Sequence, residues 1–274
     1  MKKTAVVRCL RRLARLWPRG SVIAAHALAV LTGPLGYGIA DHRIAAAFPE
    51  LDRRARRRVR RRTFSSFLKG EAVDAGVQRR KNLRDYPRLV PNPALDSLRP
   101  PLIVASFHVG PFPALGAVLR SLEGRPFIVT REQFIGRPDI TMLHEGDDEG
   151  QRARTLNRAL AALRADGVVL VMPDGLRLGD RAVPTIDVPM LGRALSLARG
   201  PFALARMSGT AIVPMVSRWR GTSMAMTVGD PIAPGLGEEG MAAAAGAWLE
   251  RYLRERPEEI SVFVLDLLLP PLPR

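Results

Sequence analysis

Short apolar runs alternate with amphipathic stretches over most of this chain. Each apolar run is bounded by Pro or Gly and is too short for a helix, which is typical of a buried strand. We predict strands over 102–107, 126–131, 168–172, 211–216 and 223–228. We predict helices over 113–122, 152–164, 201–208 and 238–256, and a loop over 133–150. This order predicts an α/β fold with a mixed central sheet flanked by helices.

The first 45 residues follow a different pattern. A start rich in Lys and Arg precedes an apolar stretch at 21–40, which His26 and several Gly and Pro residues interrupt. The stretch falls short of a clean 20-residue span, and no small-residue cleavage site follows it. We interpret 1–45 as a helical, membrane-associating arm, with a plain core helix as the alternative, and 46–274 as the α/β domain. Without a secretion signal, we expect a cytoplasmic location.

The segment from Leu51 to Lys69 has the pattern of a basic amphipathic helix. Apolar positions recur every four residues from Leu51 to Phe67, and eight arginines fill the other faces between Arg53 and Arg62. Such a helix can lie on an anionic membrane, or it can pack on the sheet and expose its arginines to water. Nucleic-acid binding is the least favoured interpretation, because the chain carries no recognition motif or aromatic-lined basic groove.

Composition agrees with an anionic partner and argues against a metal centre. The chain has 42 Lys and Arg against 26 Asp and Glu, a net charge of +16, so it must attract polyanions or anionic lipid surfaces. Its single cysteine, Cys9, excludes an intramolecular disulfide and a thiolate zinc site. The four histidines are scattered without metal-ligand spacing, so we predict no metal and no cofactor.

Two polar residues follow neighbouring predicted strands. His108 comes after the strand at 102–107, and Asp174 comes after the strand at 168–172 in the turn Pro173-Asp174-Gly175. Open α/β sheets bind ligands at the carboxyl ends of their strands, so we expect both residues at one functional edge. The alternatives are a histidine that bonds a turn carbonyl and an aspartate that only shapes its turn.

A second candidate lies at the helix predicted to begin at Gly200-Pro201. A helix start presents free backbone N–H groups that suit a phosphate. Arg193 and Arg199 lie just upstream and are predicted substrate-binding residues.

The run PLIVASFHVGPFPALG at 101–116 resembles the acyl-acceptor motif of the bacterial lipid A biosynthesis acyltransferases, the lauroyl and myristoyl transferases. In that motif a His is followed, after four residues, by Asp or Glu; here the position holds Pro113. Further phrases resemble the family in order: FPE at 48–50, VPMLGRALSLARGPFALARMSGTAIVPMV at 188–216 and LERYLRERPEE at 249–259. The resemblance covers about residues 45–258.

This resemblance implies a glycerolipid acyltransferase-like fold at the cytoplasmic face of the inner membrane. It implies transfer of a fatty acyl chain from an acyl carrier protein or coenzyme A thioester, which is a co-substrate, to a hydroxyl of a membrane glycolipid. His108 is then the base, Asp174 matches an aspartate near the active site, and we expect oxyanion donors at Arg131 and the backbone N–H of Gly110.

Pro113 leaves two interpretations open, because proline can neither orient an imidazole nor donate a hydrogen bond. Either Asp174 supplies the acid from the neighbouring strand end, or the chain is a catalytically impaired relative that binds lipid or serves as a scaffold.

Overall fold

The computed structural model describes most of the 274-residue chain, namely residues 8–9, 12–13, 18–31, 41–79, 89–110, 122, 125–130, 141–144, 149–175, 183–221 and 223–269. Its α-helices are α2 Pro18–Leu31, α3 Asp41–Ala47, α4 Arg53–Arg79, α5 Pro93–Asp96, α7 Glu149–Arg164, α8 Gly200–Ser208, α9 Gly237–Glu255 and α10 Val262–Leu268. Its strands are β1 Leu102–Ser106, β2 Arg125–Thr130, β3 Thr141–His144, β4 Gly167–Val171, β5 Thr185–Met190, β6 Arg193–Ala198, β7 Ile212–Arg220 and β8 Ser223–Val228. Short 3-10 helices are η3 Pro234–Leu236 and η4 Pro257–Glu259.

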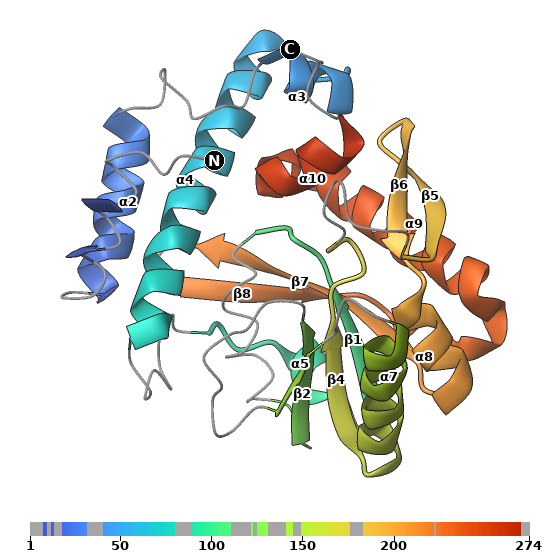
Figure 1. Cartoon of the computed structure of the whole chain (residues 1–274). Coiled ribbons are helices and arrows are strands. Elements are labelled where there is room, and N and C mark those ends of the chain that lie inside the picture. The colour runs from blue at the N-terminus through green and yellow to red at the C-terminus, as the bar shows by residue number, and fades with distance from the viewer. Residues whose placement is uncertain are drawn as a thin grey trace.

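Within these described residues, six strands form one sheet in the order β3-β2-β4-β1-β7-β8 (Figure 1). Neighbours pair in parallel except β7 and β8, which are antiparallel. The remaining strands, β5 and β6, form a separate antiparallel hairpin. The predicted fold class is therefore confirmed: the protein is a mixed α/β structure with a parallel-rich central sheet flanked by helices.

Both faces of the central strands are buried, which explains their unbroken apolar sequences. On one face, Ile103 and Val169 pack with side chains of α7, α8, α9 and α10. On the other face, Val104 and Leu170 pack with Leu95 of α5 and with other apolar residues. Alternate side chains of a strand point to opposite faces, so each buried strand contributes to both layers.

The amino-terminal helices pack against the rest of the molecule. Helix α2 lies beside α4, where Ala25 contacts Phe64 and Leu68 in a small apolar cluster (Figure 1). Ile44 and Ala47 of α3 are buried in the main core together with the helices of the α/β domain. Among the described helices, none is both long enough and apolar enough to cross a membrane.

Most predicted elements are confirmed to within a few residues at each end, and three segments differ. The loop predicted at 133–150 contains strand β3 and the beginning of α7. The β5–β6 hairpin was not predicted, because Pro189 within β5 argues against a strand. The apolar segment 260–269, which the sequence leaves open between a packed strand and a membrane-touching tail, contains helix α10. The helix predicted at 113–122 falls almost entirely outside the described residues.

Candidate active site

His108 and Asp174 are in direct contact at the carboxyl edge of the sheet. Strands β1 and β4 are parallel neighbours, with Ala105 opposite Val171, so the two strands end side by side. The backbone N–H of His108 donates to Oδ2 of Asp174 at 2.7 Å, and its Nδ1 lies 2.9 Å from Oδ1. Both carboxylate oxygens therefore bind the same histidine, one through the backbone and one through the ring.

The two partners differ in exposure. The Asp174 side chain is fully buried, whereas the His108 side chain is 18% exposed. A buried carboxylate is stabilised only when its oxygens are paired, and these two contacts pair both of them. The carboxylate favours the tautomer in which Nδ1–H donates to Asp174, and Nε2 is then the nitrogen that can accept a proton. The pair has the arrangement of a general base held by an orienting acid.

Two further segments border the imidazole. The ring of Phe263, in helix α10, lies 4.4 Å from the His108 ring, centroid to centroid, at an interplanar angle of 38°. Gly175, in the turn after β4, is also close: a Cβ added there would lie 3.5 Å from Cε1 of His108. Helix α10 thus contacts the ring, and the turn after β4 lies next to it.

The turn after His108 is held by the segment that follows α9. Gly110 has a φ of +62°, and its N–H donates to the carbonyl of Glu259 at 3.2 Å. A Cβ at this position would overlap the carbonyl oxygen of Ser217 on β7, so the close approach requires glycine. The Gly110 N–H, which we predicted as an oxyanion donor, is therefore engaged elsewhere, and this structure gives that role no support.

The Glu259 carboxyl group is buried behind this turn. Its Oε2 is inaccessible and has no hydrogen-bond partner among the described residues. Burial, followed by the neighbouring charge of Glu258, raises the pKa of Glu259 to about 7, against the opposing effect of Arg218 and other cations. This carboxyl group consequently titrates near neutral pH, unlike an ordinary surface glutamate.

Lys69 of α4 lies at the same end of the sheet. Its Nζ donates to the carbonyl of Gly221 at 3.1 Å and lies 5.3 Å from the centre of the Trp219 ring. Burial lowers the pKa of Lys69, and the charge of Glu259 partly offsets that effect. Helix α4 therefore contributes a buried cation to the region behind the His108 turn.

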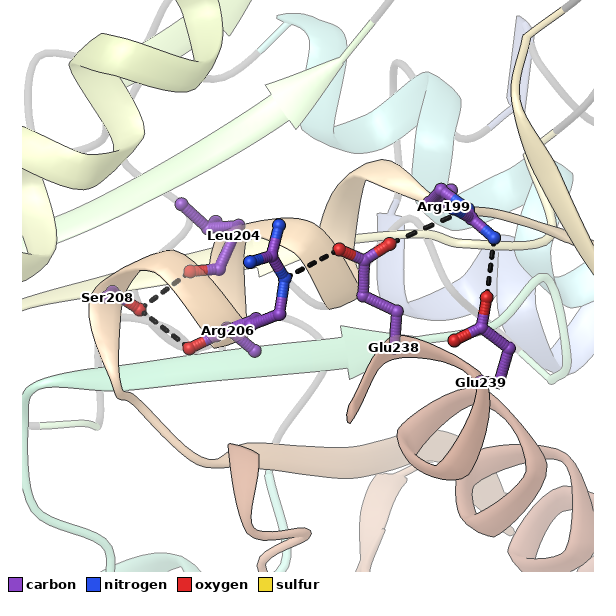
Figure 2. A network of polar contacts seen from close by, with 7 residues as sticks. Arg199, Leu204, Arg206, Ser208, Glu238 and Glu239 are labelled. Carbon is purple, nitrogen blue, oxygen red and sulfur yellow. Dashed lines mark hydrogen bonds and ion pairs between the residues drawn. The ribbon is translucent and has the colours of Figure 1, made fainter. Parts of the chain in front are cut away.

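Arg199 is engaged in an ion-pair network between α8 and α9 (Figure 2). It lies 2.6 Å from Oε1 of Glu239 and 3.5 Å from Oε2 of Glu238, and Arg206 shares Glu238 at 2.8 Å. Arg193 is exposed at the beginning of β6, and Arg131 falls outside the described residues. The substrate-binding roles of these three arginines remain predictions, because nothing described brings them to the imidazole.

Helix α4 carries a row of exposed arginines, which we call the arginine face. Its members are Arg53, Arg54, Arg57, Arg58 and Arg61. At the end of this row, Arg62 forms an ion pair with Glu258 at 2.7 Å, and the Thr63 hydroxyl donates to the Glu258 carbonyl at 3.1 Å. The helix thus presents positive charge outward while its other side holds the segment next to the His108 turn.

Two residues of the site, Glu259 and Phe263, were not predicted. Glu259 ends the phrase at 249–259 that resembles the family, and Phe263 lies in the apolar run that follows, whose one charged residue is Asp266. Across the described part of the chain, no group of three or more His, Cys, Asp or Glu side chains could share a metal ion.

Comparisons with known proteins give little beyond the geometry. No model of a known protein family matches the chain, and no curated protein matches it. Among solved structures, the chain is similar to the 1-acyl-sn-glycerophosphate (LPA) acyltransferase PlsC from Thermotoga maritima. The identity is 16%, the TM-score is 0.44, and the match covers 92% of this chain and 99% of that one.

Proposed function

We propose that this chain is an acyltransferase that moves a fatty acyl chain from an acyl carrier protein or coenzyme A thioester to a hydroxyl of a membrane glycolipid or a related lipid. The observation that carries the proposal is the contact of 2.9 Å between Nδ1 of His108 and the buried Asp174. An imidazole held in one tautomer by a buried carboxylate is suited to take a proton from a hydroxyl at neutral pH.

In the proposed reaction, Nε2 of His108 removes the proton of the acceptor hydroxyl as its oxygen attacks the thioester carbonyl carbon. The new C–O bond forms, the C–S bond breaks, and the leaving thiolate takes the proton back from the imidazolium. Asp174 remains ionised throughout and stabilises the positive charge that develops on the ring. All atoms and charges balance without a metal or an added cofactor.

In this proposal, Asp174 supplies the orienting acid that is missing at Pro113. The resemblance to the lipid A biosynthesis acyltransferases places an acid at that position, and proline cannot replace it. The pairing of β1 with β4 instead supplies a carboxylate from a different strand, and it reaches the ring within hydrogen-bond distance. The ordered family phrases at 45–258 support the choice of an acyl thioester and a lipid hydroxyl as substrates.

The arginine face supports an anionic membrane surface as the partner at which the lipid acceptor is met. Basic side chains near such a surface each contribute about 1 kcal/mol to binding. We propose that the protein binds the cytoplasmic face of the inner membrane through α4 and the amino-terminal segment, and we expect no nucleic-acid partner.

The test is thioester consumption by the purified full chain with a panel of lipid acceptors. We expect turnover by the wild type, none by His108→Ala above background, and a loss of about 10⁴-fold in Asp174→Asn, since removing the charge of an orienting carboxylate has an effect of that size. The exposed Asp230→Asn change is the matched control and should leave turnover intact. Wild-type turnover equal to that of His108→Ala would refute the proposal.

The same assay decides the alternative of a lipid-binding relative without turnover. Pro113→Glu restores the acid at the motif position. Activity that appears only in this variant would show that Asp174 does not replace the motif acid and that the natural chain binds lipid without transferring an acyl group.

A further inference from the structure

We propose that Arg218 binds a phosphate group of a substrate at the edge of the sheet that carries His108. The inference rests on the proposed function, because a phosphate is present both in the pantetheine arm of an acyl carrier protein or coenzyme A thioester and in the head group of an anionic lipid acceptor. It assigns a role to a residue that lies between the family phrases at 188–216 and 249–259.

The backbone of β7 brings Arg218 to the His108 turn. Strand β7 is a parallel neighbour of β1, so the two strands direct their carboxyl ends to the same edge of the sheet (Figure 1). The turn approaches β7 so closely that a Cβ added to Gly110 would overlap the carbonyl oxygen of Ser217. Arg218 is the next residue of β7 and therefore lies one residue from this contact.

The side chain of Arg218 lies on the face of the sheet that α9 and α10 cover. Alternate side chains of a strand share a face, and Val216, two positions earlier, is buried in the core cluster that includes residues of both helices. Burial raises the pKa of Glu259, and the charge of Arg218 opposes that rise, so the two side chains lie near each other. Arg218 thus lies beside the segment whose Glu259 carbonyl binds the Gly110 N–H.

The Arg218 side chain has a fixed stem and an open end. Its Nε is inaccessible, although the residue as a whole is only partly buried. None of its guanidinium nitrogens forms a hydrogen bond or an ion pair with a residue in the described part of the chain. A guanidinium presents its N–H donors in a planar fork that matches two oxygens of a phosphate. A fork whose stem is already ordered loses little conformational freedom when it binds such a group.

The surroundings of Arg218 carry an excess of positive charge. Three cations act on the carboxyl group of Glu259, namely Arg218, Arg256 and Lys69. The other carboxyl group that acts on it, that of Glu258, forms an ion pair with Arg62 at 2.7 Å, so its charge is already matched. Among the described residues, the charge of Glu259 is therefore too small to balance these cations, and the excess favours an anionic ligand.

The simpler alternative is that Arg218 only stabilises the buried carboxylate of Glu259. That role requires a positive charge near Glu259 and makes no demand on the substrate. The two alternatives differ in the double variant, which carries Arg218→Gln together with Glu259→Gln and so leaves no uncompensated carboxylate. If Arg218 served only Glu259, the double variant would bind its substrates as the wild type does, whereas a phosphate-binding Arg218 would still be missed.

The experiment measures KM for the donor and for the acceptor separately in the thioester assay. It compares the wild type, Arg218→Gln, the double variant and the matched control Arg220→Gln, which removes an exposed arginine from the same face of β7. We expect KM for one substrate to rise about tenfold to 100-fold in Arg218→Gln and in the double variant, with kcat within about twofold, because losing a hydrogen bond to a charged group has an effect of that size. A raised donor KM assigns the phosphate to the thioester, and a raised acceptor KM assigns it to the lipid.

Three outcomes of this assay would overturn the inference. They are unchanged KM values for both substrates in Arg218→Gln, an equal rise of KM in Arg220→Gln, and a return to the wild-type KM in the double variant.

A second measurement does not depend on turnover. The full chain is titrated calorimetrically with coenzyme A and, separately, with glycerol 3-phosphate, as models of the two sources of phosphate. We expect one probe to bind the wild type and Arg220→Gln about tenfold more tightly than Arg218→Gln and the double variant. No difference with either probe would overturn the inference. Binding that depends on Arg218 in a wild type without turnover would refute the proposed function alone.

Discussion

The buried carboxyl group of Glu259 gives the protein an unusual dependence of stability on pH. Its Oε2 is inaccessible and unpaired among the described residues, and burial raises its pKa from the ordinary 4.5 to about 7. Replacing Glu259 with Gln keeps the size and the polar character of the side chain but removes the titration. The variant should therefore differ from the wild type in a way that changes with pH.

The direction follows from which state binds the proton more tightly. The pKa is higher in the folded protein, so between about pH 4.5 and pH 7 the folded state holds a proton that the unfolded state has released. The free energy of unfolding consequently falls as the pH rises through this window. A rise from 4.5 to about 7 corresponds to about 3 kcal/mol, at 1.36 kcal/mol per pKa unit.

Urea denaturation of both proteins at pH 4.5, 6, 7 and 8.5 measures this difference. We expect Glu259→Gln to match the wild type at the lowest pH and to be more stable by about 3 kcal/mol at pH 8.5. The exposed Glu255→Gln change on α9 is the control and should show no such trend. A difference between Glu259→Gln and the wild type that stays constant across this range would refute the reasoning.

Two further predictions concern the His108 turn and the arginine face. Gly110→Ala should lower the free energy of unfolding by about 3 kcal/mol or more, since its Cβ would overlap a backbone oxygen. The control is Gly192→Ala, with a φ of +74° and open space around it, which should cost only about 1 kcal/mol of backbone strain. Equal losses in the two variants would contradict the overlap. Removing three charges from the arginine face should weaken binding to anionic vesicles about 100-fold at low salt, at about 1 kcal/mol per charge. The variant carries Arg54→Gln, Arg58→Gln and Arg61→Gln, and its control carries Arg154→Gln, Arg158→Gln and Arg164→Gln on α7. Equal weakening by both, or tighter binding to DNA than to vesicles, would contradict a membrane role for this face.

The sheet could be predicted because its central strands are buried on both faces. Strands such as β1 and β4 need apolar residues at every position, and the Gly and Pro residues around them mark their ends. Strand β3 lacks this signal, because four residues with polar ends look the same in a loop as at the edge of a sheet. The β5–β6 hairpin has alternating burial, but Pro189 within β5 argues locally against a strand.

Only the site residues at the ends of neighbouring parallel strands could be predicted from the sequence. His108 and Asp174 each follow a parallel strand, and parallel neighbours deliver their carboxyl ends to one edge, so the sequence was sufficient to place them together. Glu259 and Phe263 reach the same turn from the end of the chain through packing of α10 on the core. No local pattern encodes that packing, since an apolar run of this length suits a strand as well as a helix.

The pairing of β1 with β4 holds His108 and Asp174 together. Asp174 comes from the neighbouring strand end, so its alignment with His108 depends on the register of β1 against β4. A slip of one residue would move it by about 3.3 Å and would break both of its contacts. Because Asp174 binds the backbone N–H as well as Nδ1, the same carboxylate that sets the tautomer also fixes the turn that carries the ring. In the reaction that we propose, Pro113 is then no obstacle, because Asp174 supplies the orienting charge from the edge of the sheet.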